Sequence, residues 1–116
     1  MTSLTHMPTA SIVLLAYNQE QFVEEALLSL LNQDIDDLEI VVSDDCSSDA
    51  TWEKIQTIAD SYRGSKKIIL SRNAENIGIV NNYYAGVKKS TGELIFTAAA
   101  DDISLSDRCS KSIQFW

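Results

Sequence analysis

Several residue types are scarce in this sequence, and each scarcity removes a class of protein from consideration. The 116 residues include one proline and four glycines, so the composition is that of a globular domain rather than a disordered or fibrous chain. The two cysteines, Cys46 and Cys109, stand far apart and do not form a metal-ligand spacing. We expect two free thiols in a reducing compartment, with a single disulfide as the open alternative.

Positive charge and long apolar runs are also scarce. Nine Lys and Arg residues face 17 Asp and Glu residues, and the net charge of -8 argues against a nucleic-acid partner. A small anionic ligand held through a bound cation remains compatible with this charge. No stretch approaches the roughly 18 consecutive apolar residues of a membrane helix, so we expect a cytoplasmic protein.

Residues 1–8 form a polar leader that has neither the basic start nor the apolar core of a signal peptide. We expect this leader to be flexible, and the single histidine, His6, to be a tail residue rather than a ligand or a base. Residues 9–116 then make one domain, because no internal repeat or linker interrupts them.

Short apolar runs alternate with amphipathic segments along this domain. The runs typical of buried strands are residues 11–16, 38–43, 66–71 and 93–99. The segments with helical spacing are residues 20–33, 50–62, 78–90 and 106–116. Strands joined by helices pair in parallel through right-handed crossovers, which predicts a doubly wound α/β sheet with helices on both faces.

Local signals refine the predicted helices. Phe22 lies on the apolar stripe of the first helix and Trp52 on that of the second, so both are expected in the core. Ser47–Asp49 supplies good N-caps for the second helix. Gly92 is expected to stop the third helix.

Polar residues follow every predicted strand. The four pairs are Tyr17–Asn18, Asp44–Asp45, Arg72–Asn73 and Asp101–Asp102. Because ligands bind outside the carboxyl ends of the strands in doubly wound sheets, we expect these pairs to share one site. Adjacent carboxylates repel unless a cation lies between them, and Mg²⁺ or Mn²⁺ prefers such oxygens and shares its coordination with ligand phosphates. The pattern predicts a divalent cation beside an oxygen-rich ligand.

Structural explanations compete with this interpretation. Both acidic pairs could be solvated turns or helix caps. Tyr17 could be an aromatic lid on the core, and Arg72 could be a residue at a solvated strand end. Neither a G-x-x-x-x-G-K-[ST] loop nor a G-x-G-x-x-G turn is present, so the sequence supports neither a P-loop nucleoside triphosphatase nor a dinucleotide-binding fold.

Two segments carry a resemblance to a known family. "SIVLLAYNQEQFVEEALLSLLNQDIDDLEIVVSDDCSSDAT" and "NAENIGIVNNYYAGVKKSTGELIFTAAADDI" closely resemble the family 2 glycosyltransferases of the GT-A fold, over residues 9–103. The resemblance implies a nucleotide-sugar donor that lies across the strand ends. The implied donor-binding residues are Ala16, Tyr17, Asn18, Asp44 and Asp45 at the base and ribose, Asn76 and Gly78 in the loop beside the nucleotide, and Asp101 at the diphosphate. The implied metal ligands are Asp101 and Asp102.

The resemblance also implies an activity. It is the transfer of a sugar from a nucleoside diphosphate sugar, with a UDP-sugar favoured, to a hydroxyl of a glycan or lipid-linked acceptor, typically with inversion. Such chemistry serves polysaccharide or cell-surface glycan synthesis in the cytoplasm, including the inner face of the membrane. Mg²⁺ or Mn²⁺ is the implied cofactor, which screens charge on the departing diphosphate.

The chain departs from the family patterns D-x-D-D, D-D-G-S and A-R-N-x-G. Ala99 stands where an aspartate is usual, Cys46 replaces a turn glycine, and residues 82–86 lack the arginine. The fold also normally continues for about another hundred residues, which hold the acceptor site and the general base. We therefore expect residues 9–116 to be a truncated nucleotide-sugar-binding part whose catalytic base lies beyond Trp116.

Other functions stay open. A non-catalytic nucleotide-binding remnant or interaction domain would keep this fold without turnover. A phospho-receiver domain is less favoured, because it would place its acidic pair after the first strand, where Tyr17–Asn18 stands. Truncation would expose the edge of the fourth strand and the apolar residues Ile113, Phe115 and Trp116, which predicts a homodimer.

Overall fold

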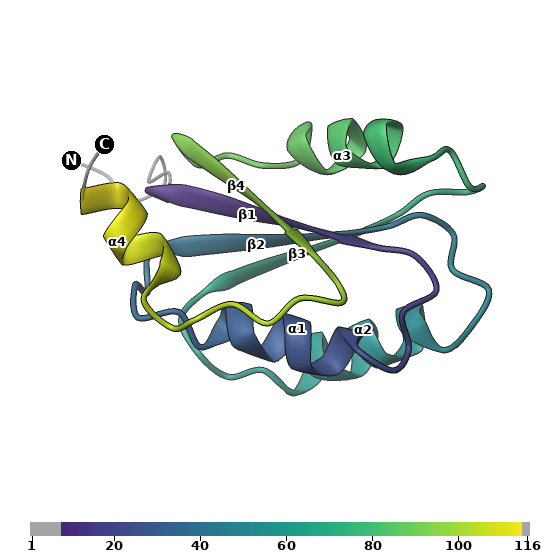
Figure 1. Cartoon of the computed structure of the whole chain (residues 1–116), viewed down its shortest axis with the longest axis horizontal. Helices are drawn as coiled ribbons and strands as arrows, with labels where there is room; N and C mark the ends of the chain where they lie inside the picture. The colour runs from purple at the N-terminus through teal and green to yellow at the C-terminus, as the bar shows by residue number, and fades with distance from the viewer. Residues whose placement is uncertain (1–7, 115–116) are drawn as a thin grey trace.

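The computed structural model describes residues 8–114, which form a four-stranded parallel sheet (Figure 1). Its strands are β1 (Ala10–Ala16), β2 (Leu38–Asp44), β3 (Lys67–Arg72) and β4 (Leu94–Ala99). The order across the sheet is β3-β2-β1-β4, so the chain builds outward through β2 and β3 and then returns to place β4 on the other side of β1. Such a switch point leaves a crevice at the carboxyl ends of the strands.

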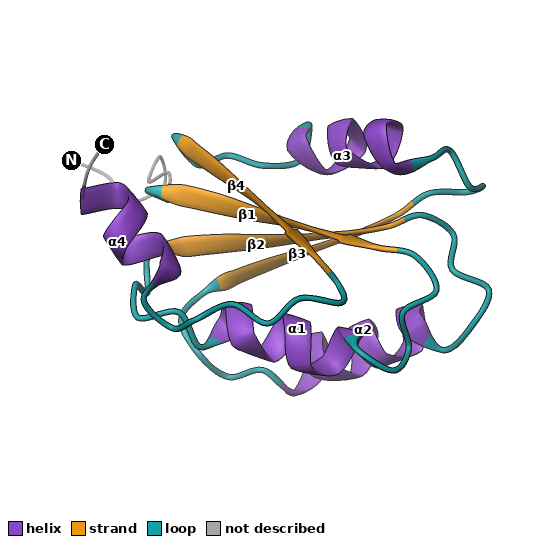
Figure 2. Cartoon of the chain, viewed as in Figure 1, coloured by secondary structure: helices purple, strands orange, loops and turns teal. Residues whose placement is uncertain are grey.

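Four helices lie within the described residues. They are α1 (Val23–Leu31), α2 (Thr51–Ser61), α3 (Ile79–Val87) and α4 (Arg108–Gln114). α1 and α2 cover one face of the sheet and α3 covers the other (Figure 2), which confirms the predicted doubly wound arrangement. The longest of these helices, α2, has 11 residues, and none in the described part of the chain has the length and apolar character to cross a membrane.

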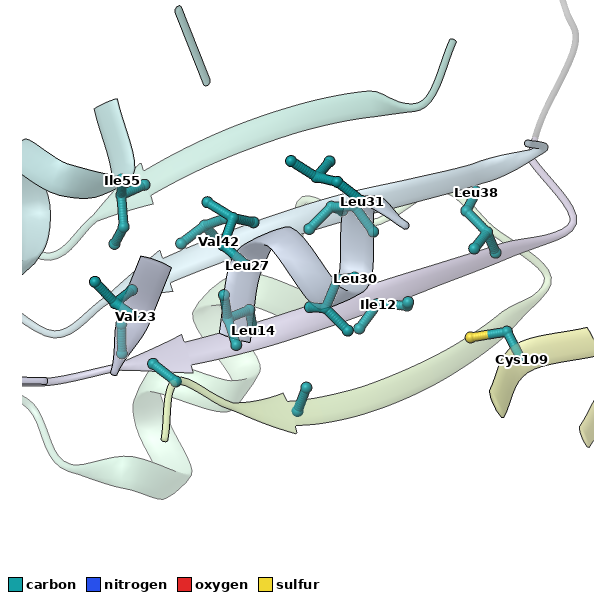
Figure 3. Packing of buried hydrophobic residues seen from close by; sticks show 14 of the residues in the cluster. Ile12, Leu14, Val23, Leu27, Leu30, Leu31, Leu38, Val42, Ile55 and Cys109 are labelled. Carbon is teal, nitrogen blue, oxygen red and sulfur yellow. The ribbon is translucent and has the colours of Figure 1, made fainter. Parts of the chain in front are cut away.

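The main hydrophobic core lies between the sheet and the α1–α2 layer. β1 and β2 are buried along nearly their whole length, which explains why both are continuous apolar runs rather than alternating ones. Ile12 and Leu14 of β1 join Leu27 and Leu30 of α1 in this cluster (Figure 3). Burial of each such side chain contributes about 1.5–3 kcal/mol relative to an exposed position.

Phe22 lies outside this core, and the prediction that placed it there is wrong. Phe22 is 53% exposed, because α1 begins one residue later. Phe22 belongs instead to the preceding turn, in which its own N–H donates to Gln19 O at 3.0 Å. Trp52 does pack against the core, where it is partly buried.

The residues predicted to cap α2 serve different purposes. Ala50 occupies the N-cap position, and the carboxylate of Asp49 accepts the backbone N–H of Thr51 at 2.9 Å. Burial raises the pKa of Asp49, but the hydrogen bonds from Thr51 and from the backbone N–H groups of Glu20 and Asp49 together outweigh this effect and hold the pKa below its ordinary value. Ser47 and Ser48 bond instead to the loop that follows β1.

Gly92 does not stop α3, which ends at Val87. It lies against β1, where an added Cβ would stand 2.5 Å from the carbonyl carbon of Ala10. Its N–H donates to Ser11 Oγ at 2.8 Å. Only a residue without a side chain permits this close approach of two backbones.

α4 packs against the carboxyl end of α1. Gln33 donates from Nε2 to Leu105 O at 2.6 Å and accepts the N–H of Cys109 at 3.1 Å. Cys109 is buried, and this burial raises the pKa of its thiol. Ile113 packs partly buried against the core, so the expectation that it is exposed is wrong.

Both cysteines are free thiols, as predicted. Four further expectations fall on residues that the structure does not describe: most of the leader at 1–7, His6 within it, Phe115 and Trp116.

A buried carboxylate joins the strands at the amino end of the sheet. Glu39 of β2 is fully buried and accepts hydrogen bonds of 2.8 Å from Ser11 Oγ, the Thr91 backbone N–H and Thr91 Oγ1. Lys67 Nζ lies 3.9 Å from Glu39 Oε2. These contacts tie β1, β2, β3 and the segment before β4 to one another.

We expect Glu39→Ala to lower the free energy of unfolding by about 3 kcal/mol, because it leaves two hydroxyls and one backbone N–H without their acceptor. Urea denaturation followed by circular dichroism measures the loss. Glu93→Ala, at an exposed position next to β4, is the matched control and should change stability by less than about 0.5 kcal/mol. Equal stabilities of the two variants would contradict the role given to Glu39.

Candidate functional site

A cavity of about 1140 Å³ opens at the carboxyl end of the sheet, at the switch between β1 and β4. This volume is ample for a small-molecule ligand. The predicted site residues that line it are Ala16, Tyr17, Asp45, Asn76, Gly78 and Asp102. The structure thus brings together side chains that follow β1, β2, β3 and β4.

Backbone hydrogen bonds continue past the strands and hold the loops in register. The N–H of Asp45 donates to Ala16 O at 2.9 Å, and the N–H of Asn73 donates to Asp44 O at 2.9 Å. The segments that follow β1, β2 and β3 are therefore joined side by side at the carboxyl edge of the sheet.

Asp44 lies outside the cavity lining, against the expectation that both members of its pair contact the ligand. Successive side chains of a strand point to opposite faces, so Asp44 faces the α2 side and Asp45 faces the cavity. Asp44 is fully buried, accepts the N–H of Ser47 at 3.0 Å and lies 3.4 Å from Arg72 Nε. Arg72 also donates to Ser47 O at 2.9 Å and lies 5.6 Å from the centre of the Trp52 ring. The guanidinium of Arg72 therefore makes its contacts with residues of the fold around Asp44.

Asn18 is also absent from the cavity lining. It adopts φ = 50°, a left-handed conformation that asparagine tolerates, and its Oδ1 accepts the N–H of Ser48 at 2.8 Å. The N–H of Asn18 donates to Ser47 Oγ at 3.0 Å. Asn18 therefore joins the loop after β1 to the loop after β2.

The carboxylate of Asp45 binds the β3–α3 loop, which we define as Asn73–Gly78. Asp45 is 3% exposed. Its Oδ1 accepts Asn73 Nδ2 and the N–H of Ile77, each at 2.9 Å. Its Oδ2 accepts Asn76 Nδ2 at 3.1 Å and the N–H of Gly78 at 2.9 Å. Gly78, with φ = 89°, then leads into α3 through a conformation that favours glycine.

Asn82 is a cavity residue that the sequence did not single out as part of the site. It lies on α3, is 2% exposed and donates from Nδ2 to Ser43 O at 2.9 Å. Its Oδ1 accepts Ser43 Oγ at 2.7 Å and Asn73 Nδ2 at 2.9 Å. An asparagine on a buried helix face is the signal that would have identified it.

Asp101 and Asp102 follow β4 in a turn whose Asp102 N–H donates to Ala99 O at 3.0 Å. Both side chains are exposed; Asp102 and Ala99 line the cavity and Asp101 does not. Among residues 8–114, no three Asp, Glu, His or Cys side chains converge as a metal centre. Two exposed carboxylates still fit a Mg²⁺ or Mn²⁺ ion that takes its other ligands from water and a phosphate group.

Two cationic side chains of α4 line the cavity, and neither was predicted as a site residue. Arg108 donates from Nη2 to Thr97 O at 2.8 Å and lies 5.8 Å from the centre of the Phe96 ring. Lys111 Nζ lies 3.1 Å from a carboxylate oxygen of Asp107. They bring positive charge to a cavity whose other charged lining residues are Asp45, Asp102 and Asp107.

The cavity at the switch point, with carboxylates at the ends of β2 and β4, is the kind of crevice in which doubly wound domains bind their ligands. A sequence model described as Glycosyl transferase family 2 matches residues 11–116, and the chain belongs to this family. The GalNAc(5)-diNAcBac-PP-undecaprenol beta-1,3-glucosyltransferase of Campylobacter jejuni is 36% identical over 109 residues, which cover 93% of this chain and 34% of that enzyme.

Solved structures show the same fold. TarS 1-349 of S. aureus in complex with UDP superposes with a TM-score of 0.81 at 25% identity, over 92% of this chain and 31% of that chain. The mannosyltransferase PcManGT of Pyrobaculum calidifontis, in complex with GDP-Man and Mn²⁺, superposes with a TM-score of 0.77 at 27% identity, over 85% of this chain and 29% of that chain. The fold is the GT-A fold, and this chain spans about a third of the length of these proteins.

We expect Cys46→Gly to raise the free energy of unfolding by about 0.5–1 kcal/mol. Cys46 has φ = 60°, a conformation that costs a residue with a side chain about 1–2 kcal/mol, part of which the greater freedom of glycine in the unfolded chain offsets. Cys46→Val should lower stability, because a β-branched side chain fits this conformation poorly. Urea titration compares the variants, and a valine variant more stable than the glycine variant would refute the strain.

Proposed function

We propose that this chain is the donor-binding part of a glycosyltransferase that transfers a sugar from a nucleoside diphosphate sugar to an acceptor hydroxyl. The observation that carries the proposal is the cavity at the β1–β4 switch, into which all four strand-end segments bring side chains. Membership of family 2 supports it, as do related structures in complex with UDP-GlcNAc or with GDP-Man and Mn²⁺. We favour a UDP-sugar as donor.

We assign the nucleoside to the part of the cavity between the end of β1 and the start of α3. Ala16 and Tyr17 line it from the end of β1, and Asn76 and Gly78 line it from the loop before α3. Asn18 and Asp44 do not line the cavity, and we assign to them the support of the loops that carry these contacts.

We assign the diphosphate to the end of β4. Asp101 and Asp102 would hold a Mg²⁺ or Mn²⁺ ion there through oxygen ligands, and Arg108 and Lys111 add positive charge to the same cavity. When bound, the cation supplies Lewis-acid screening of the charge that develops on the leaving diphosphate.

We place the acceptor site and the general base outside residues 9–116. The share of each relative that this chain spans, 34% of the Campylobacter jejuni enzyme and 31% of the TarS chain, supports this division. PP-undecaprenol stands in the name of that enzyme. We propose a glycan or lipid-linked acceptor for this chain too, inversion at the transferred sugar, and a cytoplasmic location at the inner face of the membrane.

Calorimetric titration of UDP and GDP, with and without Mn²⁺, tests the donor site. We expect UDP to bind with Mn²⁺ and to bind at least about tenfold more weakly without it or in Asp102→Asn, because the diphosphate loses the cation. Asp60→Asn, an exposed aspartate of α2 away from the cavity, should bind like the wild type.

Nucleotide binding that ignores Mn²⁺ would favour a non-catalytic nucleotide-binding domain. The absence of binding to either nucleotide under both conditions would overturn the proposal.

We also propose a homodimer formed through the free edge of β4. Within residues 8–114, β4 pairs with β1 alone, and apolar residues of β4 and of the segment after it are exposed: Ile95 by 41%, Ile103 by 66% and Leu105 by 77%. Light scattering at tens of micromolar should give twice the 12.9 kDa of the chain, and Ile95→Lys should return it to a monomer. A monomeric wild type at this concentration would count against the dimer.

A further inference from the structure

We infer that the outer side of α3 is a membrane-contact surface that binds an anionic lipid bilayer. We call this surface the α3 patch, and its residues are Ile77, Val80, Tyr84, Val87, Lys88 and Lys89. The contact itself is argued from the surface of α3. Its purpose, which is to bring a lipid-linked acceptor to the cavity, rests on the proposed function.

The two sides of α3 are reversed relative to those of an ordinary surface helix, which turns its apolar side to the core and its polar side to water. α3 packs on the sheet through Asn82 and Gly86, which are both buried. An added Cβ at Gly86 would stand 2.5 Å from Val13 Cγ1 of β1. On the outer side of the helix, Val80 is 63% exposed and Tyr84 is 57% exposed. An apolar partner is therefore expected against this side.

The apolar residues of the patch form a continuous stripe. Residues 77, 80, 84 and 87 are three or four positions apart, the spacing that makes side chains neighbours on one side of a helix. Ile77, which is 37% exposed, extends the stripe just before the helix begins. Within residues 8–114, no other helix covers α3 (Figure 1). Ile77, Val80 and Tyr84 do not line the cavity, so donor binding does not account for their exposure.

The charge around α3 identifies the partner. The chain has a net charge of -8, yet residues 76–92, between Glu75 and Glu93, contain no acidic residue and two lysines, Lys88 and Lys89. Both lysines are exposed, and among the residues that the structure describes neither one forms an ion pair. An apolar surface that carries a tyrosine and ends in lysines matches the interface of an anionic bilayer, where Tyr lies at the headgroups and Lys meets the lipid phosphates.

The acidic side chains of the other helix layer lie on the far side of the sheet (Figure 2). α1 carries Glu24 and Glu25 without a basic residue, and α2 carries Glu53 and Asp60 with Lys54. A helix is about 10 Å across, and charge is screened over about 8 Å at physiological ionic strength, so this layer does not cancel the attraction at α3. A second copy of the chain is a poorer partner, because a two-fold contact through α3 would bring the lysines of both copies together.

The α3 patch borders the cavity. Gly78 and Ile79, where α3 begins, line the cavity, and Val80 and Tyr84 follow on the outer side of the helix. A bilayer that binds the patch therefore lies beside the cavity. A lipid-linked acceptor then reaches the bound donor without leaving the membrane.

Flotation of the chain with lipid vesicles at graded lipid concentrations tests the surface. We expect the wild type to bind vesicles of mixed phosphatidylglycerol and phosphatidylcholine, to bind phosphatidylcholine alone at least about tenfold more weakly, and to dissociate as salt is added. Lys88→Gln with Lys89→Gln should weaken binding to the anionic vesicles by about tenfold or more, because each lysine near such a surface contributes about fivefold in affinity. Lys54→Gln with Arg63→Gln removes the same charge on the α2 side and should bind like the wild type.

Val80→Ser tests the apolar contact, and Leu28→Ser is its matched control, because Leu28 is 46% exposed on α1 at the far side of the sheet. We expect Val80→Ser to weaken vesicle binding by about tenfold and Leu28→Ser to leave it unchanged. Tyr84→Ser is a second variant of the same surface. Circular dichroism and UDP titration of Val80→Ser should match the wild type, because Val80 is exposed and does not line the cavity.

A wild type that does not bind the anionic vesicles, or that binds them as tightly as its lysine and Val80→Ser variants do, would overturn the membrane-contact surface. A wild type that stays off vesicles and forms a dimer that Val80→Ser dissociates in light scattering would overturn it in favour of a second copy over the patch. Binding to vesicles without binding to UDP or GDP would refute the donor site and support the surface. Binding to UDP without binding to vesicles would refute the surface alone.

Discussion

Two neighbouring carboxylates at the end of β2 hold the carboxyl edge of this domain together, and the geometry of the site depends on them. Because adjacent residues of a strand face opposite sides, Asp44 binds Ser47 and Arg72 on the α2 side, and Asp45 binds the β3–α3 loop on the other. Buried charge is tolerated only where donors surround it. Within residues 8–114, no buried side-chain nitrogen or oxygen lacks a hydrogen-bond partner. Repulsion between the two charges is offset on both faces.

A similar arrangement closes the opposite end of the sheet. Glu39 joins β1 and β2 to the segment before β4, just as Asp45 joins β2 to the segment before α3. The apolar strands between them supply most of the driving force for folding, which is not directional. The polar contacts at the two ends are directional, and they determine which loop lies against which strand.

The two halves of the cavity rest on different kinds of structure. The wall near β2 and α3 is a buried network that includes Asn82, whereas the Asp101–Asp102 turn is exposed. Two departures from the family pattern, Cys46 and Ala99, fall one beside each half of the cavity. Cys46 keeps the left-handed turn that a glycine would make without strain, and Ala99 leaves the turn after β4 with two carboxylates. The two sides of the cavity are therefore held in place by separate sets of contacts.

Hydrophobic periodicity is a local property, and the sequence by itself therefore determined the order of strands and helices, the parallel class of the sheet and the edge at which polar residues gather. Which member of the Asp44–Asp45 pair reaches the cavity was decided by the pleat of β2 relative to the helices. Phe22 left the core because α1 begins after it, Gly92 was required by a backbone 81 residues away, and Asn82 gained its role from a serine 39 residues away. Only the tertiary structure decides such contacts, because their partners are distant in the chain and leave no periodic signal near the residue itself.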